Sequence, residues 1–118
     1  MATIEKGSAT WTLINVFTVA PENQQKLIDI LIDATRKTMG QMPGFVSANI
    51  HRSRDGVRVV NYAQWASKEA FETMTRDPRA QEHMKLIGDI ATADFHLYEV
   101  VETFSSQEAS LQSHPGNS

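Results

Sequence analysis

The 118-residue sequence contains no cysteine. Disulfides, thiolate nucleophiles and cysteine-ligated zinc are therefore excluded, and a reducing compartment, the cytoplasm, is the expected location. Positive charge is also scarce: 11 Lys and Arg stand against 14 Asp and Glu, with the two signs interleaved along the chain. Without a basic stripe or a polybasic segment, neither nucleic acid nor an anionic membrane surface is an expected partner.

Long apolar runs are missing as well. No window approaches the length of a membrane-spanning helix, and the first twenty residues mix Glu, Lys, Ser and Thr into the positions where a signal peptide has its apolar core. A chain of this length accommodates one hydrophobic core. We therefore expect a polar lead-in over residues 1–8, one domain over 9–104 and a flexible tail over 105–118, which is poor in apolar residues.

Local signals along the chain predict a β-α-β-β-α-β order. Pro21 fits the first position of a helix, Asp55-Gly56 between two apolar runs is a hairpin signal, and Ser67 is a helix N-cap. Asp77-Pro78 combines a second cap with a first-turn proline, so the second helical region should break near Arg76. The predicted strands cover residues 9–19, 45–52, 57–66 and 93–104, and the predicted helices cover 21–39 and 68–87. This order is typical of a ferredoxin-like α+β fold, in which a four-stranded antiparallel sheet carries both helices on one face.

Strand periodicity and candidate chemistry coincide in the run from Val59 to Trp65. A period of two puts Asn61 and Trp65 on the same face, with their Cα atoms roughly 13 Å apart at about 3.3 Å per residue. The first predicted strand repeats the pattern, because Asn15 lies on an otherwise apolar face. A buried amide that lacks a partner costs about 1–3 kcal/mol. Each amide therefore needs either a neighbouring strand or a ligand, and both remain open.

The opposite face of the predicted sheet is apolar and has no helix to cover it. An exposed patch of this kind is unusual for a monomer. We therefore expect a homodimer in which two sheets face each other and the last strand reaches across to the partner. The residues assigned to this face are Ile14, Val16, Val46, Ile50, Val60 and Tyr62.

Several short segments form a recognisable set: Pro43-Gly44-Phe45, Ser47-Ala48, His51, Asp55-Gly56, the run from Val59 to Trp65, Ser67 and Glu69-Ala70. With the elements in the order given above, the chain from about residue 13 to 101 resembles the antibiotic biosynthesis monooxygenase family. The central strand looks most like members that oxidise anthrones and related polyketide aromatics. The resemblance implies a dimeric α+β barrel. It also implies oxidation of a hydrophobic aromatic substrate by dioxygen to a quinone without a cofactor, the substrate supplying the electrons.

The resemblance also implies a catalytic site. Asn15 and Asn61 would hydrogen-bond an oxyanion as it forms, and Trp65 would be a ring-stacking wall that also assists electron transfer. The other residues assigned to the substrate pocket are Phe17, Phe71, Met74, Met84 and His83. Phe71 stands at or near a Tyr of the polyketide enzymes, and Met84 near an Arg, so the identity of the substrate stays open.

Two other functions remain open. Heme-degrading enzymes of the same superfamily resemble the chain at Asn15 and at His83, the position of their axial iron ligand, although Met74 replaces their signature Trp. Heme binding through His83 is therefore one alternative. The other is a non-catalytic dimeric module that binds a small hydrophobic molecule. In purely structural terms, Asn15 and Asn61 would be buried amides paired with a neighbouring strand or with water, Trp65 a core residue, and His83 an exposed or packed histidine.

Overall fold

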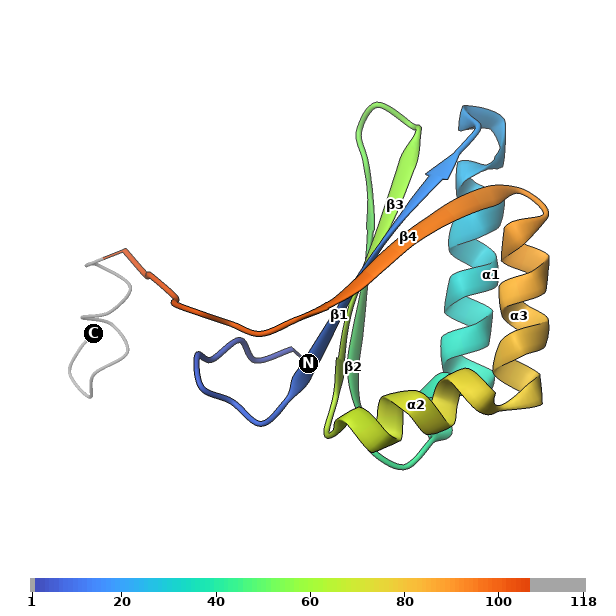
Figure 1. Ribbon diagram of the computed structural model, residues 1–118. Helices are drawn as coiled ribbons and strands as arrows, with labels where there is room; N and C mark the ends of the chain where they lie inside the picture. Colours follow the sequence, from blue (N-terminus) through green and yellow to red (C-terminus); the bar gives the residue numbers. More distant parts are fainter. Residues whose placement is uncertain (1, 107–118) are drawn as a thin grey trace.

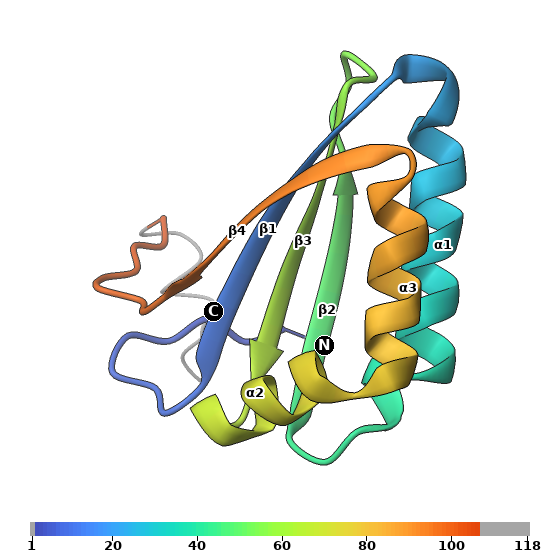
Figure 2. The ribbon, with the colours of Figure 1, turned by 45° about the vertical axis from the view of Figure 1, so that its right-hand side comes forward.

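The computed structural model describes residues 2–106, which form a four-stranded antiparallel sheet with three α-helices packed on one face (Figure 1). The strands lie in the order β2-β3-β1-β4 (Figure 2), which confirms the predicted ferredoxin-like fold. The elements are β1 (Trp11–Val19), α1 (Gln24–Lys37), β2 (Phe45–Arg52), β3 (Arg58–Trp65), α2 (Lys68–Arg76), α3 (Pro78–Gly88) and β4 (Ala91–Tyr98). Two 3₁₀ turns, η1 (Pro21–Asn23) and η2 (Met39–Gln41), flank α1.

The helical region after β3 breaks where the sequence predicts. The Ser67 side chain accepts a hydrogen bond of 3.0 Å from the backbone N–H of Ala70 at the start of α2. The Asp77 carboxylate accepts one of 2.8 Å from the backbone N–H of Arg79 at the start of α3, where Pro78 follows the cap. The Arg79 guanidinium also donates to Asp77, and these hydrogen bonds, above all those from the guanidinium, lower the pKa of Asp77 to about 2. The two caps let α2 close one end of the layer formed by α1 and α3 (Figure 1).

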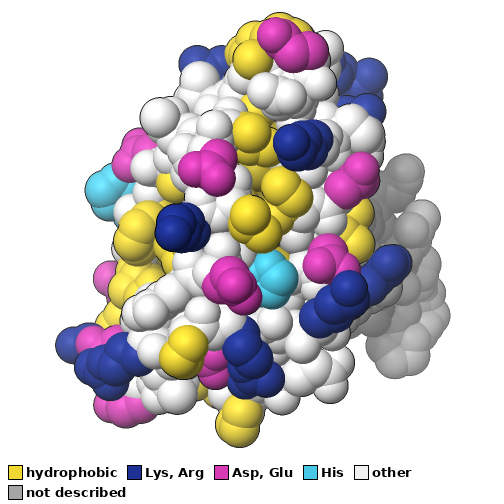
Figure 3. Space-filling view, turned by 90° about the vertical axis from the view of Figure 1, so that its right-hand side faces the viewer, with side chains coloured by type: hydrophobic (Ala, Val, Ile, Leu, Met, Phe, Trp, Pro, Cys, Tyr) yellow, Lys and Arg dark blue, Asp and Glu magenta, His cyan; other side chains and the backbone are white. Residues whose placement is uncertain are grey.

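The outer face of this helical layer carries mixed charge. Acidic and basic side chains alternate across it, with hydrophobic patches between them, rather than forming a stripe of one sign (Figure 3). No helix among residues 2–106 is long and apolar enough to cross a membrane.

The last strand differs from the prediction at both ends. β4 begins at Ala91 and ends at Tyr98, whereas the sequence pattern predicts residues 93–104. Tyr98 pairs with Thr12, and β1 begins at Trp11 rather than at residue 9, so β1 extends only one residue beyond its last pair with β4. Residues 99–106 leave the sheet on the side away from the helices (Figure 1). Residues 107–118 of the predicted tail lie outside the described part of the chain.

A β-bulge between Phe45 and Ser47 reverses the predicted faces along most of β2. Phe45 lies opposite Trp65, but Ile50, after the bulge, lies opposite Asn61. Directly opposite residues in an antiparallel pair share a face, so Ile50 points toward the helices, where it packs against the core. Its predicted position on the uncovered face is therefore wrong.

The face away from the helices is covered in part by the N-terminal segment. Gln64 Nε2 donates to the backbone oxygen of Thr3 at 2.7 Å, and Ser47 Oγ donates to Gln64 Oε1 at 2.7 Å. Gln64 and Ser47 are both buried. The apolar side chains that remain half-covered on this face are Ile14, Val16, Val60 and Tyr62.

Candidate active site

The hydrophobic core between sheet and helices consists of two separate clusters. The first contains Phe17, Val19, Leu27, Ile28, Leu31, Val59 and Ile87. The second contains Leu13, Ala63, Trp65, Phe71, Met74 and Ala80. On β1 and on β3 the boundary between the clusters falls at an asparagine, Asn15 on the first strand and Asn61 on the second. The two amides therefore interrupt the core at the same level of the sheet.

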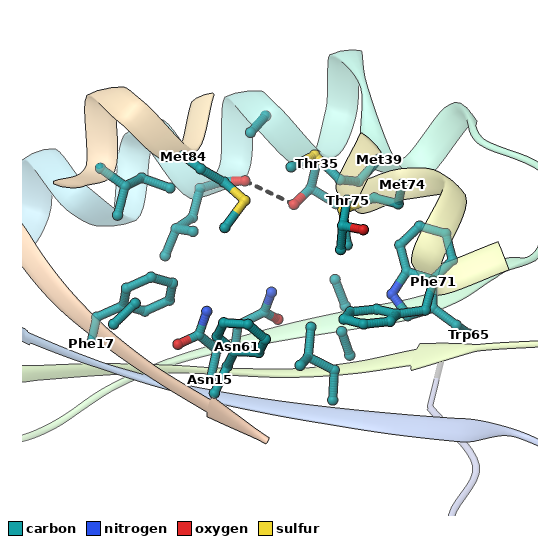
Figure 4. Close-up of a pocket in the computed structure, with 18 of the residues that line it drawn as sticks. Asn15, Phe17, Thr35, Met39, Asn61, Trp65, Phe71, Met74, Thr75 and Met84 are labelled. Atoms are coloured by element: carbon teal, nitrogen blue, oxygen red, sulfur yellow. Dashed lines mark hydrogen bonds between the residues drawn. The ribbon is translucent and has the colours of Figure 1, made fainter. Parts of the chain in front are cut away.

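An apolar cavity of about 160 Å³ lies at this boundary, with the sheet as its floor and the helices as its roof (Figure 4). Its size is close to the about 150 Å³ of an apolar cavity that holds benzene. It is smaller than the about 300–1,000 Å³ of common ligand pockets. Met84 of α3 and Phe95 of β4 line it, yet they are 42% and 45% exposed, which places its mouth between α3 and β4. A ring system larger than benzene would extend through this mouth.

The two amides lie side by side on the cavity floor. Asn15 and Asn61 are directly opposite each other in the pairing of β1 with β3. Both side-chain oxygens are buried, and neither has a hydrogen-bond partner among residues 2–106. Figure 4 shows both amide nitrogens on the side of the helices, facing the cavity. The structure thus gives no partner within the sheet to either amide, and it presents two N–H donors to whatever occupies the cavity.

Aromatic side chains bound the cavity at opposite ends. Phe17 lies at one end, and Trp65 and Phe71 lie at the other (Figure 4). Trp65 is only 2% exposed, and its ring meets that of Phe45 edge to face, with centroids 5.6 Å apart and an angle of 84°. This contact fixes the indole plane, so Trp65 is both a core residue and a wall of the cavity.

His83 is the one predicted pocket residue that the structure does not bring to the cavity. Its Nε2 shares a hydrogen bond of 3.2 Å with Oγ1 of the buried Thr38, whereas the predicted residues Met74 and Met84 do line the cavity. Consecutive helical residues point about 100° apart. Because Met84 faces the cavity, His83 points elsewhere, and it could ligate a heme in the cavity only after a rearrangement of α3.

No side chain that lines the cavity is titratable, as far as residues 2–106 are concerned. The polar side-chain atoms on its walls belong to the two amides, the Trp65 indole, and the hydroxyl groups of Thr35 and Thr75. The same part of the chain contains no group of His, Asp and Glu side chains that could hold a metal ion. The walls therefore offer hydrogen bonds and apolar surface to a ligand, but no acid or base.

Sequence reasoning missed Thr35 and Thr75. Helical spacing could have indicated both. Thr35 follows Leu31 by one helical turn, and Thr75 follows Phe71 by one turn, so each threonine lies on the apolar stripe of its helix. Phe95 was also missed, although it lies opposite Asn15 across the pairing of β1 with β4. That contact depends on strand register, which alternation alone does not reveal.

A model of the antibiotic biosynthesis monooxygenase family matches residues 10–86. The protein belongs to this family. Over 106 residues it is 45% identical to the tetracenomycin-F1 monooxygenase of Streptomyces glaucescens, in an alignment that covers 90% of this chain and 95% of the relative.

Solved structures of oxygenases share the fold. SnoaB, a cofactor-independent oxygenase from Streptomyces nogalater, is 27% identical, with a TM-score of 0.68 over 80% of this chain and 95% of SnoaB. A monooxygenase from the gene ActVA-Orf6 of Streptomyces coelicolor, solved with nanaomycin D, is 30% identical, with a TM-score of 0.67 over 80% of this chain and 92% of its own. These similarities confirm the family and the fold that the sequence predicts.

Proposed function

We propose that this antibiotic biosynthesis monooxygenase oxidises an anthrone- or quinol-like aromatic compound with dioxygen to a quinone, without a cofactor. The observation that carries the proposal is the pair of amides, Asn15 and Asn61, which lie on the floor of an apolar cavity and whose buried oxygens have no hydrogen-bond partner in the described part of the chain. The names of its relatives support it, since one is a tetracenomycin-F1 monooxygenase and another is a cofactor-independent oxygenase.

The reaction balances with dioxygen as the only co-substrate. For an anthrone, one ring CH₂ group and O₂ become a carbonyl group and water. Loss of a proton gives an anion with its charge on the ring oxygen and carbon, and this anion passes one electron to O₂. The two radicals join into a peroxide at that carbon. This peroxide anion takes up a proton to become a hydroperoxide. Loss of the second C–H proton then breaks the O–O bond, leaving the carbonyl and a hydroxide, which takes up another proton to become water.

The amides act where negative charge develops. The side-chain N–H groups of Asn15 and Asn61 face the cavity and would donate to the substrate oxygen as it becomes an oxyanion. In other enzymes one such donor accounts for a factor of about 10²–10³ in kcat. The apolar walls exclude water, which strengthens these hydrogen bonds and protects the radical pair. Trp65 limits how far the aromatic rings can move from the amides.

Oxygen uptake with a panel of anthrones and naphthols tests this function. We expect quinone formation by the wild type and a fall of about 10²–10³ in kcat for Asn61→Ala. Asn49→Ala is the matched control, because Asn49 is an amide of the neighbouring strand that does not line the cavity. If the wild type binds members of the panel but consumes no oxygen, the protein is a binding module and the proposal is refuted.

We also propose that the protein is a homodimer whose sheets face each other. Half-covered apolar side chains occupy the sheet face away from the helices, and the segment after β4 exposes Val101 by 80% and Phe104 by 92%. A partner protomer would cover both features. Sedimentation at micromolar concentration should give a dimer, and Val101→Asp combined with Phe104→Asp should weaken it. A wild-type monomer under these conditions would refute the dimer.

A further inference from the structure

The roof of the cavity carries two hydroxyl groups whose hydrogen atoms are already in use. Thr35 Oγ1 donates to the backbone oxygen of Leu31 at 2.8 Å, the bond drawn as a dashed line in Figure 4. Thr75 Oγ1 donates to the backbone oxygen of Glu72 at 2.7 Å. A hydroxyl group has one hydrogen and two lone pairs. Toward the cavity, both threonines can therefore only accept a hydrogen bond.

The floor has the opposite polarity. Asn15 and Asn61 present their amide nitrogens to the cavity, as described above, and an amide nitrogen donates but does not accept. Between donors below and acceptors above, the lining that residues 2–106 provide is apolar except for the indole of Trp65. The cavity is thus polarised across its height, from sheet to helices.

We propose that Thr35 and Thr75 determine substrate specificity by accepting a hydrogen bond from a second hydroxyl group of the aromatic substrate. This inference deepens the proposed function and rests on it. The substrate class is an aromatic compound with two oxygens on different edges. One becomes the oxyanion and meets the amides, and the other is a free phenol that meets a threonine. A compound with a methyl ether in place of that phenol lacks the O–H group that would donate a hydrogen bond to the threonine.

The positions of the two threonines favour this role over a purely structural one. Both stand among Leu, Ala, Phe and Met side chains on the core-facing stripes of their helices, where Val would fill the same volume without a hydroxyl. Thr38 shows the contrast, since its buried hydroxyl is shared with His83 rather than with the cavity. Thr73 of α2 is exposed and serves as a control.

Binding under argon tests the proposal separately from turnover. The probes are 1,5-dihydroxynaphthalene and 5-methoxy-1-naphthol, with the 1,6- and 1,7-dihydroxy isomers to vary the position of the second oxygen. For at least one isomer, the wild type should bind the diol about 5- to 150-fold more tightly than its methyl ether, the range expected when a buried acceptor loses its donor. Thr35→Val or Thr75→Val should bring this ratio close to one, by weakening diol binding alone. Thr35→Ser and Thr73→Val should preserve the ratio.

Three results would overturn the proposal: a wild type without preference for any diol, a preference unchanged in both valine variants, or no binding of any probe. Oxygen uptake with the same compounds tests the monooxygenase activity separately from the acceptor role of the threonines. A diol preference that depends on the threonines, without oxygen consumption, would uphold the acceptor role and refute the monooxygenase.

Discussion

Replacing Asn61 by leucine should make the protein more stable and inactive. The buried amide oxygen of Asn61 has no partner among the described residues, and an unsatisfied buried polar group costs about 1–3 kcal/mol. Leucine removes this cost, and the adjacent cavity of about 160 Å³ takes up its additional volume without overpacking. We therefore expect the free energy of unfolding to rise by about 1–3 kcal/mol and kcat to fall by about 10²–10³.

Asn49→Leu is the matched control for stability. Asn49 lies on the neighbouring strand, and its Nδ2 donates to the backbone oxygen of Tyr62 at 3.0 Å and to Ser47 Oγ at 3.2 Å. Its replacement should lower the free energy of unfolding by about 1–3 kcal/mol and leave turnover unchanged. Urea denaturation at one fixed protein concentration measures both variants, since a dimer's apparent stability depends on concentration. If Asn61→Leu destabilises the protein as Asn49→Leu does, the Asn61 amide is a paired structural group and our reasoning about the site fails.

Three further results are expected. No titratable side chain among the described residues lines the cavity, so kcat/KM should rise with pH as the substrate itself ionises. If the pH–rate profile instead has the same apparent pKa for substrates of different acidity, an acid or base of the enzyme takes part. His83→Ala should leave oxygen uptake unchanged, and hemin should give the same weak, unspecific spectrum with both proteins; a Soret band lost in the variant would restore the heme interpretation. Asp77→Asn should lower the thermal midpoint at pH 7. This difference in thermal midpoint between wild type and variant should shrink as the pH falls from about 4 to about 2. A carboxylate whose pKa is lowered in the folded state stabilises the fold at pH values above its unfolded-state pKa, and the stabilisation disappears as the carboxylate is protonated. A difference that persists at about pH 2 would contradict this.

Much of the fold follows from short-range chemistry that the sequence displays. The caps at Ser67 and Asp77 and the turn at Asp55-Gly56, where Gly56 has a positive φ of 86°, each depend on a few adjacent residues. The β-bulge after Phe45, in contrast, does not depend on a few adjacent residues. It shifts every following residue of β2 to the other face. Alternation in the sequence fits either phase equally well, so the face that it predicts for Ile50 is wrong.

The features of the site that lie within one strand could be predicted from the sequence. Asn15 and Asn61 each stand out as an amide on an apolar face, but their direct pairing depends on the register of β1 against β3, which the sequence does not specify. The rotation of α3 about its axis explains why Met84 lines the cavity and the adjacent His83 does not. A broad apolar stripe gave no reason to prefer one of two adjacent residues, and the packing of α3 against α1 decides that Met84 faces the cavity while His83 meets Thr38.

The division of the core into two clusters is the physical link between stability and function. A leucine or valine at Asn15 or Asn61 would join the clusters into one continuous core and occupy part of the cavity between them. The protein instead keeps two buried amide oxygens that have no hydrogen-bond partner among residues 2–106, at a cost of about 1–3 kcal/mol each. In a reaction whose electrons come from the substrate, the protein has to supply only oriented donors and a dry space for the rings and dioxygen. In the proposed reaction Asn15 and Asn61 would supply both, because an amide pair that separates two apolar clusters offers the donors and leaves a cavity between the clusters.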